Sequence, residues 1–292
     1  MSDKAILTCA LTGVLTNPNM GNIPVTPEQM ADAAEQAWNQ GATIVHCHFR
    51  DQRPGMGAYP SWDVGVVGSI INAIRERVPR IIINQSTGVV GPDISGPVAC
   101  LEAVKPEMAA CNAGSLNYLK LKEDGTWAWP PMTFDNPVGK VQAFLDVMTA
   151  NDIVPEFECF DSGIVRSVAL YKKAGMFRGD PHISLVMGVA SGQPAKPEWV
   201  PLLKNEMLPG THWQVICVGR KEVWDLQRKA LEEGGNVRTG LEDTFYLPNG
   251  DKAQSNGELV EALARITRQV GREIATAEEA RQILGLKVRP RE

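Results

Sequence analysis

Two hydrophobic patterns alternate along the chain. Short, nearly continuous apolar runs rich in Val, Ile and Thr are followed by longer stretches in which apolar residues recur every three to four positions. The first pattern is typical of parallel strands covered on both faces, and the second of amphipathic helices. The eight apolar runs, each predicted to be a strand, are 5–11, 43–49, 81–87, 108–114, 154–161, 182–188, 212–219 and 236–243.

Helix signals lie between these runs. Thr26 can cap a helix that has Pro27 in its first position and Gln29 as the partner of a capping box, and Gly41 ends that helix. A final short helix starts at Thr276, where Glu279 closes a second capping box. The other predicted helices are 62–78, 95–104, 137–151, 162–175, 197–208, 221–234 and 256–272.

Eight strand-then-helix units predict an α/β fold of the (β/α)8 TIM-barrel type, a single domain over residues 1–292 with a short C-terminal helical extension. A doubly wound open sheet is disfavoured because no Gly-x-Gly-x-x-Gly turn follows the first strand. The long non-helical insertions 12–25, 51–61 and 116–136 follow strands, so we expect them over the C-terminal mouth of the barrel.

Composition narrows the function classes. The net charge is −5 with both signs mixed along the chain, which argues against nucleic-acid binding. The apolar run 5–11 is too short for a signal peptide or a membrane span, so we expect a cytoplasmic protein without a membrane partner. The six cysteines form no Cys-x-x-Cys pair and are interpreted as reduced core residues: Cys9, Cys47, Cys100, Cys111, Cys159 and Cys217.

Polar residues gather at the predicted C-terminal strand ends. His46 and His48, two of only four histidines, alternate along the second strand and therefore face the same space. Glu242 lies on the last strand, which neighbours the first in a closed barrel. The three residues are predicted to bind one divalent metal, with Zn²⁺ expected, and to leave positions open for substrate. The alternative is a pair of hydrogen-bonded core histidines.

Two further acids can carry protons. Asp243 can act as a base that Arg238 keeps ionised and aimed, although a structural Arg–Asp pair is also common. Glu156 and Glu158 share one face of the fifth strand, and Glu158 lies nearer the mouth. It can orient a ligand histidine or carry a proton; alternatively it is a barrel glutamate paired with an inward Arg or Lys.

Candidate substrate contacts follow the third and fourth strands. The Ser86 hydroxyl and the backbone N–H groups of Thr87 and Gly88 suit a carboxylate or oxyanion, and Asn112 offers a donor and an acceptor. No histidine is near Ser86 in sequence, which disfavours a serine nucleophile.

Other metal-dependent barrels fit less well. Amidohydrolase-like barrels carry His-x-His on the first strand, whereas here it is on the second, and His182 and His212 lie at strand starts. Non-haem Fe(II) oxygenases with two histidines and one carboxylate usually have all-β folds.

The chain resembles the β-keto acid cleavage enzymes over nearly its whole length. The resemblance rests on the following segments: Thr12-Gly13, Pro24-Val25-Thr26-Pro27-Glu28, His46-Cys47-His48-Phe49-Arg50-Asp51, Asn84-Gln85-Ser86-Thr87-Gly88, Gly114-Ser115-Leu116-Asn117-Tyr118, Glu156-Phe157-Glu158-Cys159-Phe160-Asp161 and Val237-Arg238-Thr239-Gly240-Leu241-Glu242-Asp243.

This resemblance implies a Zn²⁺-dependent TIM barrel that converts a β-keto acid and acetyl-CoA into acetoacetate and a new acyl-CoA. It implies that Asp243, supported by Arg238, removes a proton from C2, that zinc polarises the keto oxygen and stabilises the enolate, and that the carbanion attacks acetyl-CoA before a retro-Claisen step. It also implies a homotetramer. The other implied roles are zinc binding by His46, His48 and Glu242, carboxylate binding by Ser86, proton transfer supported by Glu158, and a substrate contact at Asn112.

One departure from the family concerns the substrate. The aminohexanoate-cleaving enzymes carry a glutamate just after the Thr-Gly of the first strand, where it meets an ammonium group, but this chain continues Val14-Leu15-Thr16. A buried cation without a partner is costly, so we expect a substrate with an uncharged or apolar far end. A quaternary ammonium held by Trp127 and Trp129 is an alternative, against simple loop packing of both rings.

Two other functions keep the same metal site. A metal-dependent aldolase or hydrolase would not need CoA, and a non-catalytic metal or solute binder would show no turnover; the lack of an export signal disfavours a periplasmic binder. The sequence has no specific phosphate loop for CoA, and Arg220, after the seventh strand, is the candidate for its pyrophosphate.

Overall fold

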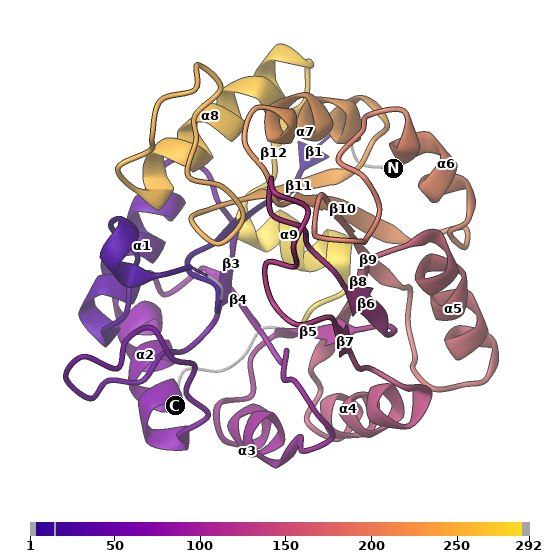
Figure 1. Cartoon of the computed structure of the whole chain (residues 1–292), viewed down its shortest axis with the longest axis horizontal. Coiled ribbons are helices and arrows are strands. Elements are labelled where there is room, and N and C mark those ends of the chain that lie inside the picture. Colours follow the sequence, from indigo (N-terminus) through magenta and orange to yellow (C-terminus); the bar gives the residue numbers. More distant parts are fainter. Residues whose placement is uncertain (1–3, 15, 288–292) are drawn as a thin grey trace.

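A closed barrel of eight parallel strands forms the centre of the molecule (Figure 1). The computed structural model describes residues 4–14 and 16–287. Around the barrel the strand order is β10-β11-β2-β3-β4-β5-β8-β9, and the predicted TIM-barrel fold is confirmed. The strands are β2 (Leu7–Ala10), β3 (Ile44–Cys47), β4 (Ile82–Gln85), β5 (Met108–Asn112), β8 (Val154–Cys159), β9 (His182–Met187), β10 (His212–Cys217) and β11 (Asn236–Thr239).

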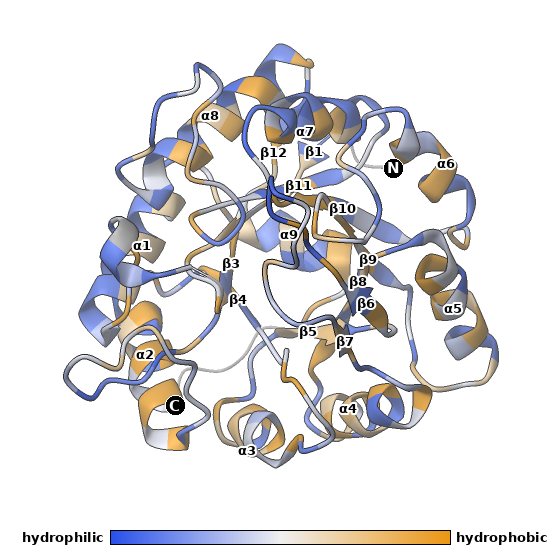
Figure 2. Ribbon diagram, in the orientation of Figure 1, coloured by the Kyte–Doolittle hydropathy of each residue, from blue (hydrophilic) through white to orange (hydrophobic). Residues whose placement is uncertain are grey.

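Helices surround the barrel, and each carries both hydrophobic and hydrophilic residues (Figure 2). The capping box predicted for the first helix is present: Gln29 N–H donates to Thr26 Oγ1 at 3.3 Å, and Thr26 N–H donates to Gln29 Oε1 at 3.1 Å. These helices are α1 (Pro27–Asn39), α2 (Val64–Arg77), α3 (Ser95–Val104), α4 (Val138–Ala150), α5 (Ser162–Lys173), α6 (Trp199–Asn205), α7 (Glu222–Glu232) and α8 (Asn256–Gln269).

Two small sheets modify the predicted pattern. The first apolar run is split, because β1 (Lys4–Ala5) pairs with β12 (Glu273–Ile274) and only the following strand, β2, enters the barrel. The insertion 116–136 contains an antiparallel hairpin of β6 (Leu116–Tyr118) and β7 (Met132–Phe134), which crosses the front of the barrel in Figure 1. A short 3-10 helix, η1 (Pro18–Met20), lies in the first insertion.

The opposite end of the barrel is closed by α9 (Ala277–Leu284), which lies behind the barrel centre in Figure 1. Its predicted capping box is present, with Glu279 N–H donating to Thr276 Oγ1 at 3.2 Å. Ala280 and Leu284 pack in one cluster with Ile82 of β4 and with Ile6, which lies between β1 and β2. The helical extension therefore seals the N-terminal end and leaves the C-terminal end for chemistry.

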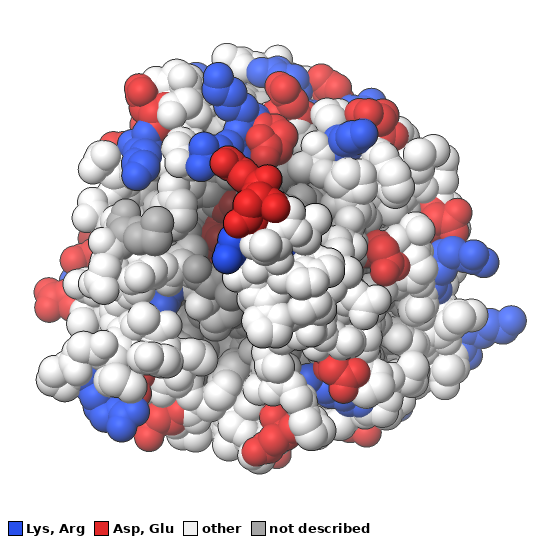
Figure 3. Space-filling model, in the orientation of Figure 1, with Lys and Arg blue, Asp and Glu red and all other residues white. Residues whose placement is uncertain are grey.

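The cysteines, the helices and the charged side chains can each be compared with the expectations from composition. All six cysteines are buried and unbridged. No helix in the described ranges is long and apolar enough to cross a bilayer. On the face that the hairpin crosses, acidic side chains gather near the middle and basic side chains lie mainly towards the rim (Figure 3).

Candidate active site

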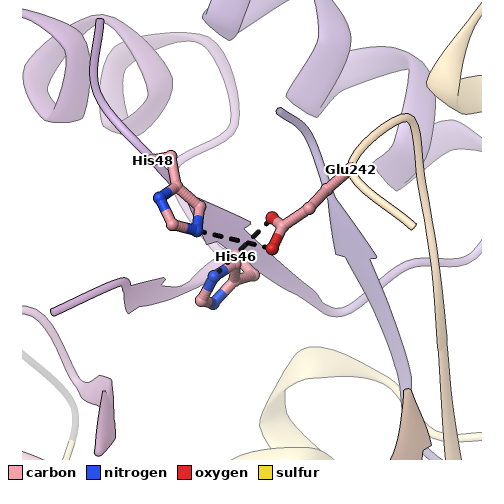
Figure 4. Close-up of side chains that lie close together, drawn as sticks. All are labelled: His46, His48 and Glu242. Carbon is pink, nitrogen blue, oxygen red and sulfur yellow. Dashed lines mark ion pairs between the residues drawn. The ribbon is translucent and has the colours of Figure 1, made fainter. Parts of the chain in front are cut away.

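His46, His48 and Glu242 converge at the C-terminal mouth (Figure 4). His46 is on β3, and His48 follows the end of that strand. Glu242 reaches the site differently from the prediction, because β11 ends at Thr239 and residues 240–243 form a turn. In this turn the N–H groups of Asp243 and Thr244 donate to Gly240 O at 2.9 and 3.0 Å. The turn, rather than strand alternation, therefore aims Glu242 at the histidines.

Two glycines make room for this arrangement. Gly240 has a φ of +147°, and a Cβ there would lie 2.1 Å from Ala10 O of the neighbouring strand. A Cβ on Gly13 would lie 2.4 Å from Glu242 Cγ. The Thr12-Gly13 segment after the first barrel strand therefore packs directly against the Glu242 side chain, which explains the glycine there.

The three side chains fit a single metal ion. His46 Nε2 is 3.7 Å from Glu242 Oε2, His48 Nε2 is 3.4 Å from Glu242 Oε1, and one ligand atom from each residue lies within 4.8 Å of the others. Both ring nitrogens of His46 and Glu242 Oε2 are buried without a hydrogen-bond partner among the described residues. Buried polar atoms normally have partners. Two imidazoles and one carboxylate are a donor set that catalytic zinc sites use, and the unpartnered atoms of His46 and Glu242 suit a bound cation.

A buried guanidinium ties three carboxyl groups together. Arg238 Nε and Nη2 donate to the two Asp243 carboxylate oxygens, each at 3.0 Å, and Nη2 lies 2.9 Å from Glu242 Oε1. Glu158 Oε1 is 3.6 Å from Arg238 Nη1. Glu242 and Asp243 together carry two negative charges when they are ionised, and one guanidinium neutralises only one of them, so the cluster retains negative charge that a bound cation would offset.

The environment separates the pKa values of these acids. Burial raises the pKa of Asp243 to about 6, although Arg238 acts in the opposite direction. Burial also raises the pKa of Glu158 to about 8, again against Arg238. Burial would raise the pKa of Glu242 too, but Arg238, His48 and His46 bring it below its ordinary value. Arg238 therefore fixes the orientation of the Asp243 carboxylate through two hydrogen bonds, while burial raises the pKa of Asp243 towards neutrality.

Three of the predicted substrate contacts form one small group. A Cβ on Gly88 would lie 3.7 Å from both Asn112 Nδ2 and Ser86 Oγ, and Gly88 N–H donates to Ser86 Oγ at 3.4 Å. Thr87 differs, because its buried hydroxyl donates to Ala110 O at 2.6 Å. Only the backbone of Thr87 is therefore left for a ligand.

The remaining predicted contacts lie farther out. Arg220 is exposed, and its guanidinium carbon is 4.9 Å from the centre of the Tyr246 ring. Trp129 stacks on Tyr118 at 5.5 Å and donates to the Tyr118 carbonyl at 3.1 Å, whereas Trp127 is exposed. These contacts support the loop-packing interpretation of Trp129.

Comparisons with known proteins show the family of the chain. The sequence model of the β-keto acid cleavage enzyme family matches residues 4–286. The chain belongs to this family. It is 34% identical over 290 residues to a 3-keto-5-aminohexanoate cleavage enzyme of Fusobacterium nucleatum, covering 98% of this chain and 100% of that protein.

Other similarities support the family and the fold. The chain is 31% identical over 297 residues to a 3-oxoadipate:acetyl-CoA acetyltransferase of Cupriavidus necator, covering 98% of this chain and 96% of that one. The apo structure of ObcA superposes with a TM-score of 0.70 at 21% identity, covering 91% of this chain and 66% of the ObcA chain. The ObcA likeness shows the barrel fold alone.

In this member of the β-keto acid cleavage enzymes, sequence reasoning missed Arg50. Its buried guanidinium donates to Thr12 Oγ1 at 2.8 Å, to Gly57 O at 3.0 Å, to Thr16 O at 2.6 Å and to Gly13 O. It therefore joins the first two insertions beside Glu242. Arg50 alternates with His46 and His48, so the same two-residue spacing could have identified it.

Proposed function

We propose that this chain is a zinc-dependent acyltransferase that converts a β-keto acid and acetyl-CoA into acetoacetate and a new acyl-CoA. The observation that carries the proposal is the juxtaposition of a two-histidine, one-carboxylate site with the Arg238–Asp243 pair at the barrel mouth. The names of the relatives, which include acetyl-CoA transferases, supply the co-substrate.

His46, His48 and Glu242 would hold the zinc ion. Zinc bound there would supply Lewis acidity towards a substrate carbonyl. The unpartnered atoms of His46 and Glu242 and the excess negative charge around Arg238 support this assignment. The metal ligands leave the Asp243 carboxylate free for proton chemistry.

Asp243 is the proposed base. Its oxygens are held by Arg238, and a pKa of about 6 leaves it mainly ionised at neutral pH yet basic enough to accept a proton from C2 of the β-keto acid. C2 then bonds to the acetyl carbonyl carbon, and the CoA thiolate leaves. The thiolate next attacks the original keto carbon, the bond from that carbon to C2 breaks, and C2 regains a proton, which gives acetoacetate and the new acyl-CoA.

Glu158 suits the return of protons. Burial raises the pKa of Glu158 to about 8, which favours its protonated form, and Glu158 contacts the same guanidinium as Asp243. Ser86 Oγ, the backbone of Thr87 and Gly88, and Asn112 would hold the substrate carboxylate. Arg220, on the exposed side of the mouth, would contact the CoA pyrophosphate.

The far end of the substrate is proposed to be uncharged, as in a short alkyl β-keto acid. The segment after the first barrel strand carries no acid, and its Thr16 hydroxyl is engaged with Gly13 O at 2.7 Å and with Arg50. Leu15, on which this expectation partly rests, lies outside the described residues. A cytoplasmic homotetramer completes the proposal, and the unbridged cysteines are consistent with a reducing compartment.

The test combines metal analysis with turnover. Bound metal is quantified in the purified protein, and acetoacetate is assayed from a panel of β-keto acids with and without acetyl-CoA, beside His46→Ala and Asp243→Asn. Stoichiometric zinc with acetyl-CoA-dependent acetoacetate is the expected result. Bound zinc together with turnover that does not depend on acetyl-CoA would favour a metal-dependent aldolase or hydrolase instead. Full metal retention in His46→Ala would refute the zinc site.

A further inference from the structure

Two buried polar residues, Asn84 beside His46 and Glu156 beyond it, have no part in the proposed reaction. Asn84 on β4 is the register partner of His46 on β3, so both side chains lie on the same side of the barrel wall. Asn84 Nδ2 donates to Glu156 Oε2 on β8 at 2.8 Å. Asn84 is fully buried and Glu156 is 4% exposed. A polar chain therefore runs from His46 across the barrel interior.

The bond to Glu156 decides which way the Asn84 amide points. Because its NH₂ group is committed to Glu156, its carbonyl oxygen points away from that carboxylate, and this oxygen has no hydrogen-bond partner among the described residues. His46 Nδ1 is buried and equally unpartnered, while His46 Nε2 is the nitrogen that faces Glu242 Oε2. An acceptor and a ring nitrogen on adjacent strands thus complement each other, and leaving both unpaired costs about 1–3 kcal/mol each.

We propose that Asn84, itself oriented by Glu156, is the positioning residue of His46. Its carbonyl oxygen accepts a hydrogen bond from His46 Nδ1–H, which fixes the tautomer and leaves Nε2 as the metal ligand. Such outer acceptors orient ligand histidines generally, and losing one typically costs 10- to 100-fold in metal affinity. The inference rests on the proposed zinc site and deepens it.

The chain offers a matched control. Gln214 Nε2 donates to the same Glu156 oxygen at 3.1 Å and to Ser184 Oγ at 3.0 Å. Gln214→Ala therefore removes a buried hydrogen bond from Glu156 without removing the bond to Asn84. If burial and packing alone mattered, Gln214→Ala and Asn84→Ala would affect metal binding alike.

Zinc affinity is measured by chelator competition on the metal-free parent and on Asn84→Ala, Glu156→Ala and Gln214→Ala. Asn84→Ala and Glu156→Ala are each expected to weaken zinc binding about 10- to 100-fold. The Asn84→Ala/Glu156→Ala double variant should weaken it no more than the stronger single variant. The zinc affinity of Gln214→Ala should stay within about threefold of the parent. In the Co²⁺-substituted proteins, the visible absorption bands should shift for Asn84→Ala and not for Gln214→Ala. A purely structural role would lower thermal stability without moving these bands.

A measurement on the parent protein removes any dependence on variant folding. With four histidines in the chain, ¹⁵N-histidine NMR of the zinc-loaded protein can identify each tautomer. We expect His46 to be protonated at Nδ1 and bound through Nε2. Coordination through Nδ1, or a folded Asn84→Ala with parental zinc affinity, overturns the inference and leaves the zinc site standing. A parent that binds no zinc overturns both.

Discussion

Replacing Gly240 by alanine tests how the turn after β11 builds the metal site. The position has a φ of +147°, and an added Cβ would lie 2.1 Å from Ala10 O, where ordinary contacts begin at 3.4 Å. The unfavourable φ alone costs about 1–3 kcal/mol. The overlap is with the backbone of a barrel strand, which cannot rotate away as a side chain can. Losses above about 4 kcal/mol are expected where such clashes add to strain.

Gly250→Ala is the control for Gly240→Ala. Gly250 also has a positive φ, of +93°, but among the described residues the only atom within 4 Å of its added Cβ is Lys221 Cε at 3.6 Å, in a flexible side chain. Denaturant unfolding should therefore show a loss of about 1–3 kcal/mol for Gly250→Ala and a clearly larger one for Gly240→Ala. Zinc affinity should fall only in Gly240→Ala, because its turn carries Glu242. Equal stability and equal zinc affinity in the two variants would refute the reasoning.

Three further predictions follow from buried polar groups. Asp243→Asn should keep its zinc but lower kcat about 10²- to 10⁴-fold, since the base is lost; an unchanged kcat would exclude Asp243 as the base. Arg50→Lys should lower the free energy of unfolding by about 2 kcal/mol or more and expose segment 12–25 to limited proteolysis. One ammonium group cannot replace the planar guanidinium that donates to Thr12, Gly13 and Thr16. Cleavage at the parental rate would contradict this. Burial lowers the pKa of His182 to about 3. As the pH drops from about 6.5 towards 3, the His182 imidazole is protonated in the unfolded chain but not in the folded protein, so the free energy of unfolding falls. This group contributes at most about 1.4 kcal/mol per pH unit to that fall. Urea unfolding of metal-free His182→Asn should therefore show a shallower pH dependence over that window, and identical slopes would rule out this role for His182.

The sequence by itself determined the order and type of nearly all elements. Each predicted barrel strand overlaps an observed one, and the capping boxes at Thr26 and Thr276 start helices where expected. These features are local, because burial on both faces imposes continuous apolar runs, and caps act within one turn. The closeness of His46, His48 and Glu242 was also predictable, since a closed parallel barrel gathers all C-terminal strand ends at one mouth.

The tertiary structure alone decided how the polar groups at the mouth and in the barrel are paired. The strand predicted to reach Asp243 stops at Thr239, and the chain turns at Gly240, whose φ of +147° and close approach to Ala10 O admit no side chain. The Arg50 contacts to the first loop, the three carboxyl groups around Arg238 and the bond from Asn84 to Glu156 join segments far apart in the chain. Side-chain periodicity indicates which face of a strand a residue lies on. Which polar side chains contact one another depends on barrel closure and strand register, and no local pattern encodes these.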